Sequence, residues 1–216
     1  MRKLLLAAVA MAAVLLGVAP MTVASAAPAA THDVLTTGKV GGTNVKVGAT
    51  LTANGSKITF ATGGSSGIKC KKAKFTAKVT KNPKAKGTAT ESLINQTFSG
   101  CSVHGISGAT GVKSIKLNHR PYKTTVKDSA GDPVTVSKTN TTITISASVG
   151  SLKCTYAAKT TTGHASNSSQ TITFSKQKFK FVSGPKPECP SSGTFSATFG
   201  PVVDSSVHGS PHVFVN

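Results

Sequence analysis

Apolar and polar residues alternate along most of this chain, a pattern typical of β-strands with one buried and one solvent-facing side. In AKFTAKVT (73–80) the alternation places Phe75 on one face and Lys74 and Lys78 on the other. The segment QTITFSKQKFKFVS (170–183) repeats this arrangement, again with phenylalanine opposite lysine. Helical periodicity does not recur, so the pattern predicts an all-β protein of antiparallel strands.

Turn signals separate the alternating runs. Asn54-Gly55 lies between two of them, and because both residues accept positive φ, this pair predicts a hairpin turn. Clusters rich in Gly, Pro, Ser and Asp predict further turns, as in KNPKAKG (81–87) and KDSAGDP (127–133). The chain is therefore expected to form many strands joined by turns.

One motif occurs twice. KITFATGGSSGIKC (57–70) and TITISASVGSLKC (142–154) each consist of an alternating run, a Gly/Ser turn and an aliphatic-Lys-Cys ending. The repeat predicts an internal duplication, about 47–103 and 134–199, and an antiparallel β-sandwich built from two related Cys-containing halves. We expect a single domain over 27–216, because each half alone would bury too little apolar surface; two adjacent sandwiches are the alternative.

The first 26 residues have the features of a secretory signal peptide. Arg2 and Lys3 precede an apolar run, and a small-x-small pattern ends at Ala26, where we expect cleavage. A membrane anchor is the alternative, but the run is shorter than the roughly 20 residues that span a bilayer. The mature chain has no other run of that length, which predicts no transmembrane segment and a secreted, extracellular or envelope-associated protein.

The chain has four cysteines, all in the mature part, and an even number in an exported protein indicates disulfides. A zinc site is disfavoured because no closely spaced Cys pair is present. If the two repeats are equivalent, Cys70 pairs with Cys101 and Cys154 pairs with Cys189. Exchange of partners between the halves is the alternative.

Two further stretches, together with the signal peptide and the repeated Cys segments, are similar to features of a group of known proteins. They are GTATESLINQTFSGC (87–101) and CPSSGTFSATFGPV (189–202). In these features the chain resembles a group of small secreted β-proteins, mostly actinobacterial and mostly without assigned function. The resemblance implies export and an Ig-like or related sandwich fold, and it implies no shared catalytic residues.

The charge is strongly positive. The formal net charge is +19, of which Arg2 and Lys3 lie in the signal peptide, and there are only six Asp and Glu residues. Lysines concentrate on equivalent strands of the two halves, and alternation predicts that they are exposed while Phe75, Phe179 and Phe181 are buried. These lysines are the candidate polyanion-binding residues: Lys69, Lys71, Lys72, Lys74, Lys78, Lys81, Lys176, Lys178 and Lys180. The alternative is that they only keep the protein in solution and protect sheet edges.

Candidate catalytic chemistry is sparse. GGSSG (63–67) matches Gly-x-Ser-x-Gly, but a nucleophile elbow needs a helix after the turn, and here a strand follows. His208 and His212 lack nearby acidic or Cys ligands. We therefore expect no enzyme, no catalytic residues, no metal and no cofactor.

These observations predict a non-catalytic secreted protein that binds anionic envelope or extracellular polymers electrostatically. The alternative is an extracellular carrier or inhibitor that holds a small ligand or peptide in a crevice of the sandwich. A hydrolase would need a deep pocket that gathers the scattered His and Asp residues. A specific nucleic-acid partner is disfavoured, because Arg and aromatic residues are too few for a stacking platform.

Overall fold

The computed structural model describes residues 31–148 and 150–216, and every regular element in them is a β-strand. No helix long and apolar enough to cross a membrane occurs within these two ranges. The signal peptide predicted for residues 1–26 lies outside the described residues. The strands are β1 (Leu35–Thr37), β2 (Thr43–Asn44), β3 (Thr50–Gly63), β4 (Ser66–Lys81), β5 (Thr88–His104), β6 (Ala109–Leu117), β7 (Tyr122–Lys127), β8 (Pro133–Ala147), β9 (Gly150–Ser166), β10 (Thr171–Ser183), β11 (Ser192–Phe199), β12 (Val203–Asp204) and β13 (Val213–Val215).

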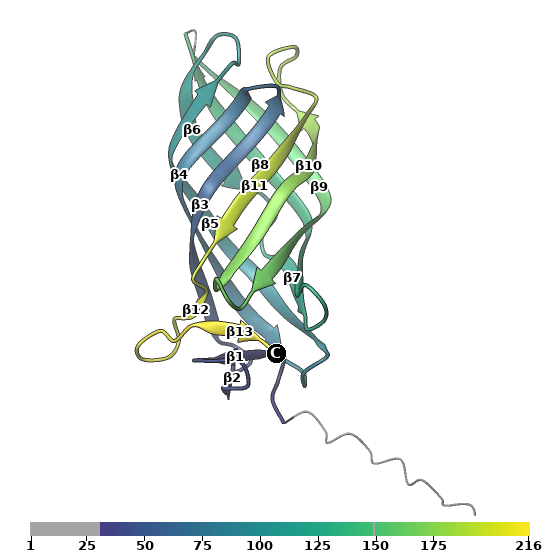
Figure 1. Ribbon diagram of the computed structural model, residues 1–216. Coiled ribbons are helices and arrows are strands. Elements are labelled where there is room, and N and C mark those ends of the chain that lie inside the picture. The colour runs from purple at the N-terminus through teal and green to yellow at the C-terminus, as the bar shows by residue number, and fades with distance from the viewer. Residues whose placement is uncertain (1–30, 149) are drawn as a thin grey trace, which may run out of the picture.

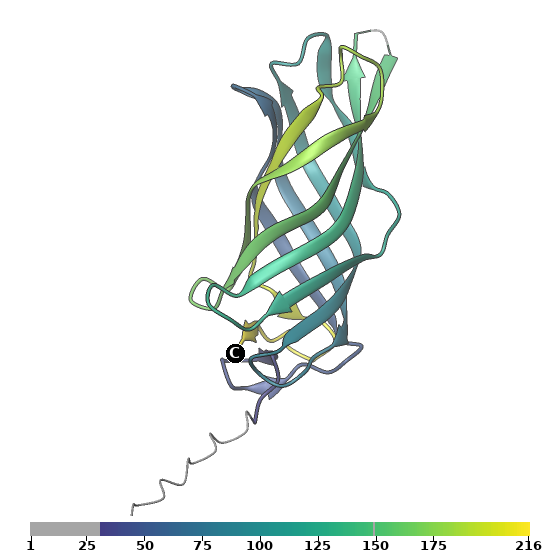
Figure 2. The same cartoon turned by 90° about the vertical axis from the view of Figure 1, so that its right-hand side faces the viewer.

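Eight of these strands form an antiparallel sheet that closes on itself as a tall barrel (Figures 1 and 2). Their order around the wall is β3, β4, β5, β7, β8, β9, β10 and β11, and β11 pairs with β3 to complete the circle. The short β12 extends along the lower part of β3, and β6 pairs with β8 above β7. Strands from both repeats therefore lie in one sheet.

The all-β, antiparallel prediction is confirmed, but the architecture differs from the predicted Ig-like sandwich. A sandwich has two stacked sheets with free edges, whereas here the ladder from Thr194↔Ala61 to Phe199↔Gly55 joins the first and last barrel strands. Closure requires strong coiling of the sheet, which small inward-facing residues permit. Such residues are present: a Cβ at Gly55 would lie 2.7 Å from the Phe199 ring, and one at Gly163 would lie 2.9 Å from Phe174.

The hairpin predicted at Asn54-Gly55 is wrong, because both residues lie inside the continuous strand β3. Gly55 pairs with Phe199 on β11, and the glycine leaves room for that ring rather than for a turn. The strand instead has an irregularity nearby, where Lys57 adopts a φ of 51°. The two repeated motifs do form hairpins, β3–β4 and β8–β9, each leading to a disulfide-bonded cysteine.

Aromatic rings line the inside of the barrel. Phe60 packs against Tyr156 with ring centroids 4.9 Å apart and against Phe179 at 6.0 Å, mostly in tilted or edge-on geometries. Phe75 and Phe174 both pack on Phe199, at 5.4 and 6.4 Å. Because the barrel is closed, all of its inward-facing side chains contribute to one core.

The lower end of the barrel is covered by a three-stranded sheet of order β13-β1-β2, next to the C-terminus (Figure 2). Leu35 of this sheet and Val34, which precedes β1, are almost fully buried. Two asparagines attach it to the barrel: Asn82 hydrogen-bonds both Leu35 backbone groups, and Asn167 hydrogen-bonds both those of Val215. Segments from the beginning and the end of the described residues thus form a plug that local strand patterns did not predict.

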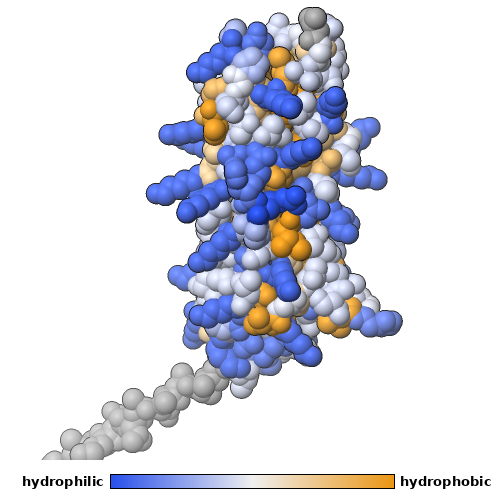
Figure 3. Space-filling view, turned by 180° about the vertical axis from the view of Figure 1, so that it is seen from behind, coloured by the Kyte–Doolittle hydropathy of each residue, from blue (hydrophilic) through white to orange (hydrophobic). Residues whose placement is uncertain are grey.

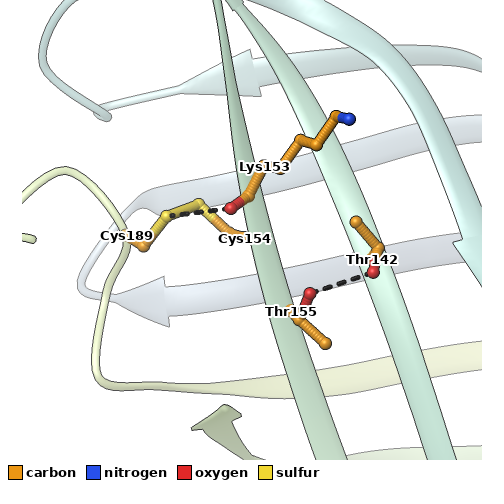
Figure 4. Close-up of a disulfide and its surroundings, with 5 residues drawn as sticks. All are labelled: Thr142, Lys153, Cys154, Thr155 and Cys189. Carbon is orange, nitrogen blue, oxygen red and sulfur yellow. Dashed lines mark hydrogen bonds between the residues drawn. A yellow bond between two sulfur atoms is a disulfide. The ribbon is translucent and has the colours of Figure 1, made fainter. Parts of the chain in front are cut away.

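Both predicted disulfides are present. Cys70–Cys101 joins paired residues of β4 and β5, and Cys154–Cys189 joins β9 to the loop between β10 and β11. Figure 4 shows Cys189 Sγ beside the Lys153 carbonyl oxygen, 3.9 Å away. Both disulfides restrain the upper part of the barrel wall, and they are consistent with an extracellular location.

Candidate functional site

The nine candidate lysines are all exposed on the outer wall of the barrel. Alternation assigned the two sides of their strands correctly: Phe179 is buried, while Phe75 and Phe181 are half-buried against the core. Outward lysines and inward phenylalanines follow directly from the two-residue period of a strand. The residues predicted as a polyanion site therefore lie where a large ligand could reach them.

The candidate lysines form two columns, one on β4 and one on β10. The strands β3 and β11 lie between β4 and β10 in the barrel wall (Figure 1). One row crosses all four strands: Lys69 pairs with Thr59, Thr59 pairs with Ser196, and Ser196 Oγ accepts a hydrogen bond from Lys176 N at 2.8 Å. Three strand spacings separate the columns, about 14 Å. We call this surface the β4–β10 face. Two lines of ammonium groups there flank a strip of hydroxyl side chains, which also contains the exposed Lys57 of β3.

Among the described residues, no lysine of this face forms an ion pair. The eight barrel strands contain a single carboxylate, Glu91, and it points into the barrel. Within residues 31–148 and 150–216 the one ion pair joins Lys84 to Asp33 at 3.1 Å, near the lower plug. Solvated surfaces normally mix charges of both signs, so an outer wall with lysine alone is unusual.

Positive charge continues around the rest of the barrel. Lys116, Lys123 and Lys138 are exposed on β6, β7 and β8, on the side opposite β3 and β11. Figure 3 shows this rear face, with hydrophilic side chains projecting from the whole outline and apolar patches between them. The β4–β10 face differs in its closer spacing, because β4 alone carries Lys69, Lys71, Lys72, Lys74, Lys78 and Lys81.

The interior holds a second candidate site that the sequence analysis missed. A cavity of about 110 Å³ lies among the aromatic rings, and Glu91 lines it. Burial raises the pKa of Glu91 from 4.5 to about 7. Its paired neighbour on β7, Thr124, is also buried, and the Thr124 hydroxyl has no hydrogen-bond partner. Alternation in ATESL (89–93) does place Glu91 on the buried face, and that signal could have identified it.

The other candidate chemistry stays dispersed. Gly64 and Ser65 form the tip of the β3–β4 hairpin, so a strand follows the turn in GGSSG, as the sequence predicted. His208 is exposed in a turn, and His212 bridges to Val203. The part of the chain that the structure describes has no group of three His, Cys, Asp or Glu residues suited to a metal ion. The interior cavity is lined by Glu91 but by no His or Asp.

Comparison with known proteins gives no family. A scan against protein-family models, a search of curated proteins and a search of solved structures found no match. The resemblance to small secreted actinobacterial β-proteins therefore stays a prediction, and function has to be inferred from this chain's own residues.

Proposed function

We propose that this protein is a secreted, non-catalytic binding protein that holds an anionic polymer of the cell envelope or extracellular matrix on its β4–β10 face. The observation that carries the proposal is the distribution of charge. The barrel strands present lysines outward and place their single carboxylate, Glu91, inside. A surface of one sign creates a potential that concentrates ligands of the opposite sign.

The arrangement of the face suits an extended polymer. Its two lysine columns run along neighbouring parts of the wall, and the Thr and Ser side chains between them supply hydrogen-bond donors. Successive phosphate, sulfate or carboxylate groups of one chain could therefore meet successive ammonium groups. Lysine is a flexible point charge, which favours repeated anionic groups over one rigid bidentate ligand.

A specific nucleic-acid partner is less favoured. Single-stranded nucleic acids are held by aromatic side chains on which bases stack, as well as by cations. Most of the aromatic rings described above pack with one another inside the barrel, away from the lysines; the half-buried Phe181 is the exception, with Lys186 Nζ 5.1 Å from its ring centroid. A polymer recognised by charge and hydrogen bonds alone fits the face better.

The test is binding of the mature protein to immobilised long-chain polyphosphate, with neutral dextran as the control matrix. We expect retention on polyphosphate that falls steeply between 50 mM and 300 mM NaCl, since the screening length is about 10 Å at 0.1 M. Replacing Lys74, Lys78 and Lys178 with Glu should weaken binding by at least about a hundred-fold at low salt, at about 1 kcal/mol per contacting lysine.

The matched control replaces Lys116, Lys123 and Lys138 with Glu, which makes the same change in net charge on the opposite side of the barrel. We expect a much smaller loss of affinity from this variant. Equal losses from both triple variants would contradict the assignment to the β4–β10 face. Retention unchanged by salt and by both variants would mean that the lysines serve only to keep the protein in solution.

A further inference from the structure

The barrel interior combines an apolar cavity with one buried acid. The cavity of about 110 Å³ is enclosed largely by aromatic and aliphatic side chains, including Phe60, Phe75, Tyr156 and Phe179. Engineered apolar cavities of roughly 150 Å³ in proteins bind benzene-sized molecules. This space therefore has the size for a small molecule with a few carbon atoms.

Glu91 lacks a charged partner inside the barrel. The side chains that line the cavity include no Lys, Arg or His, and a smaller cavity of about 30 Å³ on the other side of Glu91 has none either. The titratable groups that share the larger cavity are the hydroxyls of Tyr122 and Tyr156. A buried carboxylate is costly unless it is paired, so a cation delivered by a ligand would be strongly favoured there.

Thr124 supplies a second, independent indication. Glu91 and Thr124 are paired residues of β5 and β7, so their side chains lie next to each other on the inner wall. Thr124 is only 6% exposed, and its hydroxyl oxygen has no hydrogen-bond partner. Buried polar groups in proteins nearly always have partners, and an unpaired one next to a cavity indicates a place for a ligand atom.

The barrel wall also offers a route to the cavity. β5 pairs with β7 only over Thr88–Leu93, and no ladder joins the upper part of β5 to β6 among the described residues. Gln96 and Phe98 on β5, and Ile115 and Leu117 on β6, flank this seam and line the cavity. Leu117 also lines a hollow on the outer surface beside Arg120. Separation of two strands that share no hydrogen bonds requires less rearrangement than opening a paired ladder.

We propose that the barrel interior is a binding site for a small primary amine with an apolar body, whose ammonium group pairs with the Glu91 carboxylate and donates a hydrogen bond to the Thr124 hydroxyl. The apolar body occupies the aromatic cavity, and the ligand enters at the β5–β6 seam. This site uses the inside of the barrel and is independent of the lysine face, so either proposal can fail without the other.

The experiment uses n-butylamine as the probe and n-butanol as its uncharged analogue, both at pH 8. The chain has two tyrosines and no tryptophan, and both tyrosines line the cavity, so intrinsic tyrosine fluorescence reports on the interior directly. We expect n-butylamine to bind about ten-fold more tightly than n-butanol, as expected for a hydrogen bond to a charged group. Glu91→Gln should abolish this preference while leaving n-butanol binding unchanged.

Two further variants separate the site from a general effect of charge. Glu188→Gln removes a carboxylate from an exposed loop and should keep the preference for the amine. Thr124→Val keeps the shape of the side chain and should weaken n-butylamine binding a few-fold. If neither probe alters tyrosine fluorescence, or if the amine and the alcohol bind wild type equally well, the proposal is wrong. A preference that persists in Glu91→Gln would overturn it too.

Discussion

The protonation of Glu91 should control how the protein's stability varies with pH. Burial raises the pKa of Glu91 from 4.5 to about 7, so the folded state holds this proton more tightly than the unfolded state does. Its contribution is therefore fully present below about pH 4.5 and is lost as pH rises through 7. A shift of this size corresponds to about 3 kcal/mol in total, with the neutral acid favouring the fold.

Glu91→Gln should remove that part of the pH dependence, because glutamine is neutral at every pH and has nearly the same shape. Relative to wild type, the variant should gain between about 2 and 3 kcal/mol of stability as the pH rises from 5 to 8. Urea unfolding of wild type and variant at the two pH values measures this difference. The comparison cancels the contributions of other titrating groups, such as Asp132, whose pKa is also raised by burial. Glu188→Gln is the control and should behave like wild type. If the free energy of unfolding changed between pH 5 and pH 8 by the same amount in Glu91→Gln as in wild type, the burial of Glu91 would be contradicted.

At the scale of strands, the period-two pattern determined which side of each strand faces the core, but not which strands pair. Phe179 and Lys178 illustrate the success, since one is buried and the other exposed as alternation requires. Asn54-Gly55 illustrates the failure: the pair has the composition of a turn, yet Gly55 provides space for Phe199 on a strand more than a hundred residues away. A local pattern cannot distinguish a glycine that turns from one that faces an aromatic ring.

At the seam between β5 and β6, the rigidity of the β5 backbone should depend on one side chain. Arg120, in the turn before β7, donates from Nη1 to the Ile94 carbonyl oxygen at 2.8 Å and to Asn95 Oδ1 at 2.7 Å. These bonds fix β5 at the point where its pairing with β7 ends. We expect Arg120→Ala to increase amide hydrogen exchange over residues 94–104 several-fold on that unpaired side.

Lys123→Ala is the matched control for the seam, because Lys123 is an exposed cation on β7 close to the same turn. Its exchange pattern should match that of wild type over residues 94–104. Exchange mapped by mass spectrometry on peptic peptides is sufficient to resolve the segment. Equal protection in wild type and Arg120→Ala would show that the β5 edge is held by packing rather than by this side chain.

At the scale of the whole molecule, the sequence predicted the features that have a signal in the sequence itself. It missed the features that depend on contacts between distant segments. The disulfide pairs were predicted because the repeated Cys segments carry their order in the sequence. Closure of the barrel was not, since the β3–β11 ladder joins residues such as Phe60 and Phe195 that no local signal connects. The position of Glu91 beside Thr124 depends on another non-local pairing, the β5–β7 ladder, so the interior site required the three-dimensional structure.

The net charge should give the protein two opposite responses to salt. Without a polymer, lysines repel one another across a wall that carries no outward carboxylate, and this repulsion destabilises the compact state. Added NaCl screens it, so the Tm should rise between 10 mM and 300 mM NaCl and then level off as the screening length falls to a few ångströms.

With polyphosphate present the sign should reverse. A ligand that binds only the folded state raises the Tm by mass action, so polyphosphate should stabilise the protein strongly at 10 mM NaCl and little at 300 mM. Thermal unfolding with and without polyphosphate over the same salt range measures both effects. Replacing Lys74, Lys78 and Lys178 with Glu should reduce both, because the variant has less repulsion to screen and fewer cations on the β4–β10 face. If the Tm rose equally with salt in the presence and in the absence of polyphosphate, the protein would not bind this polymer. The lysines would then affect stability only by repelling one another.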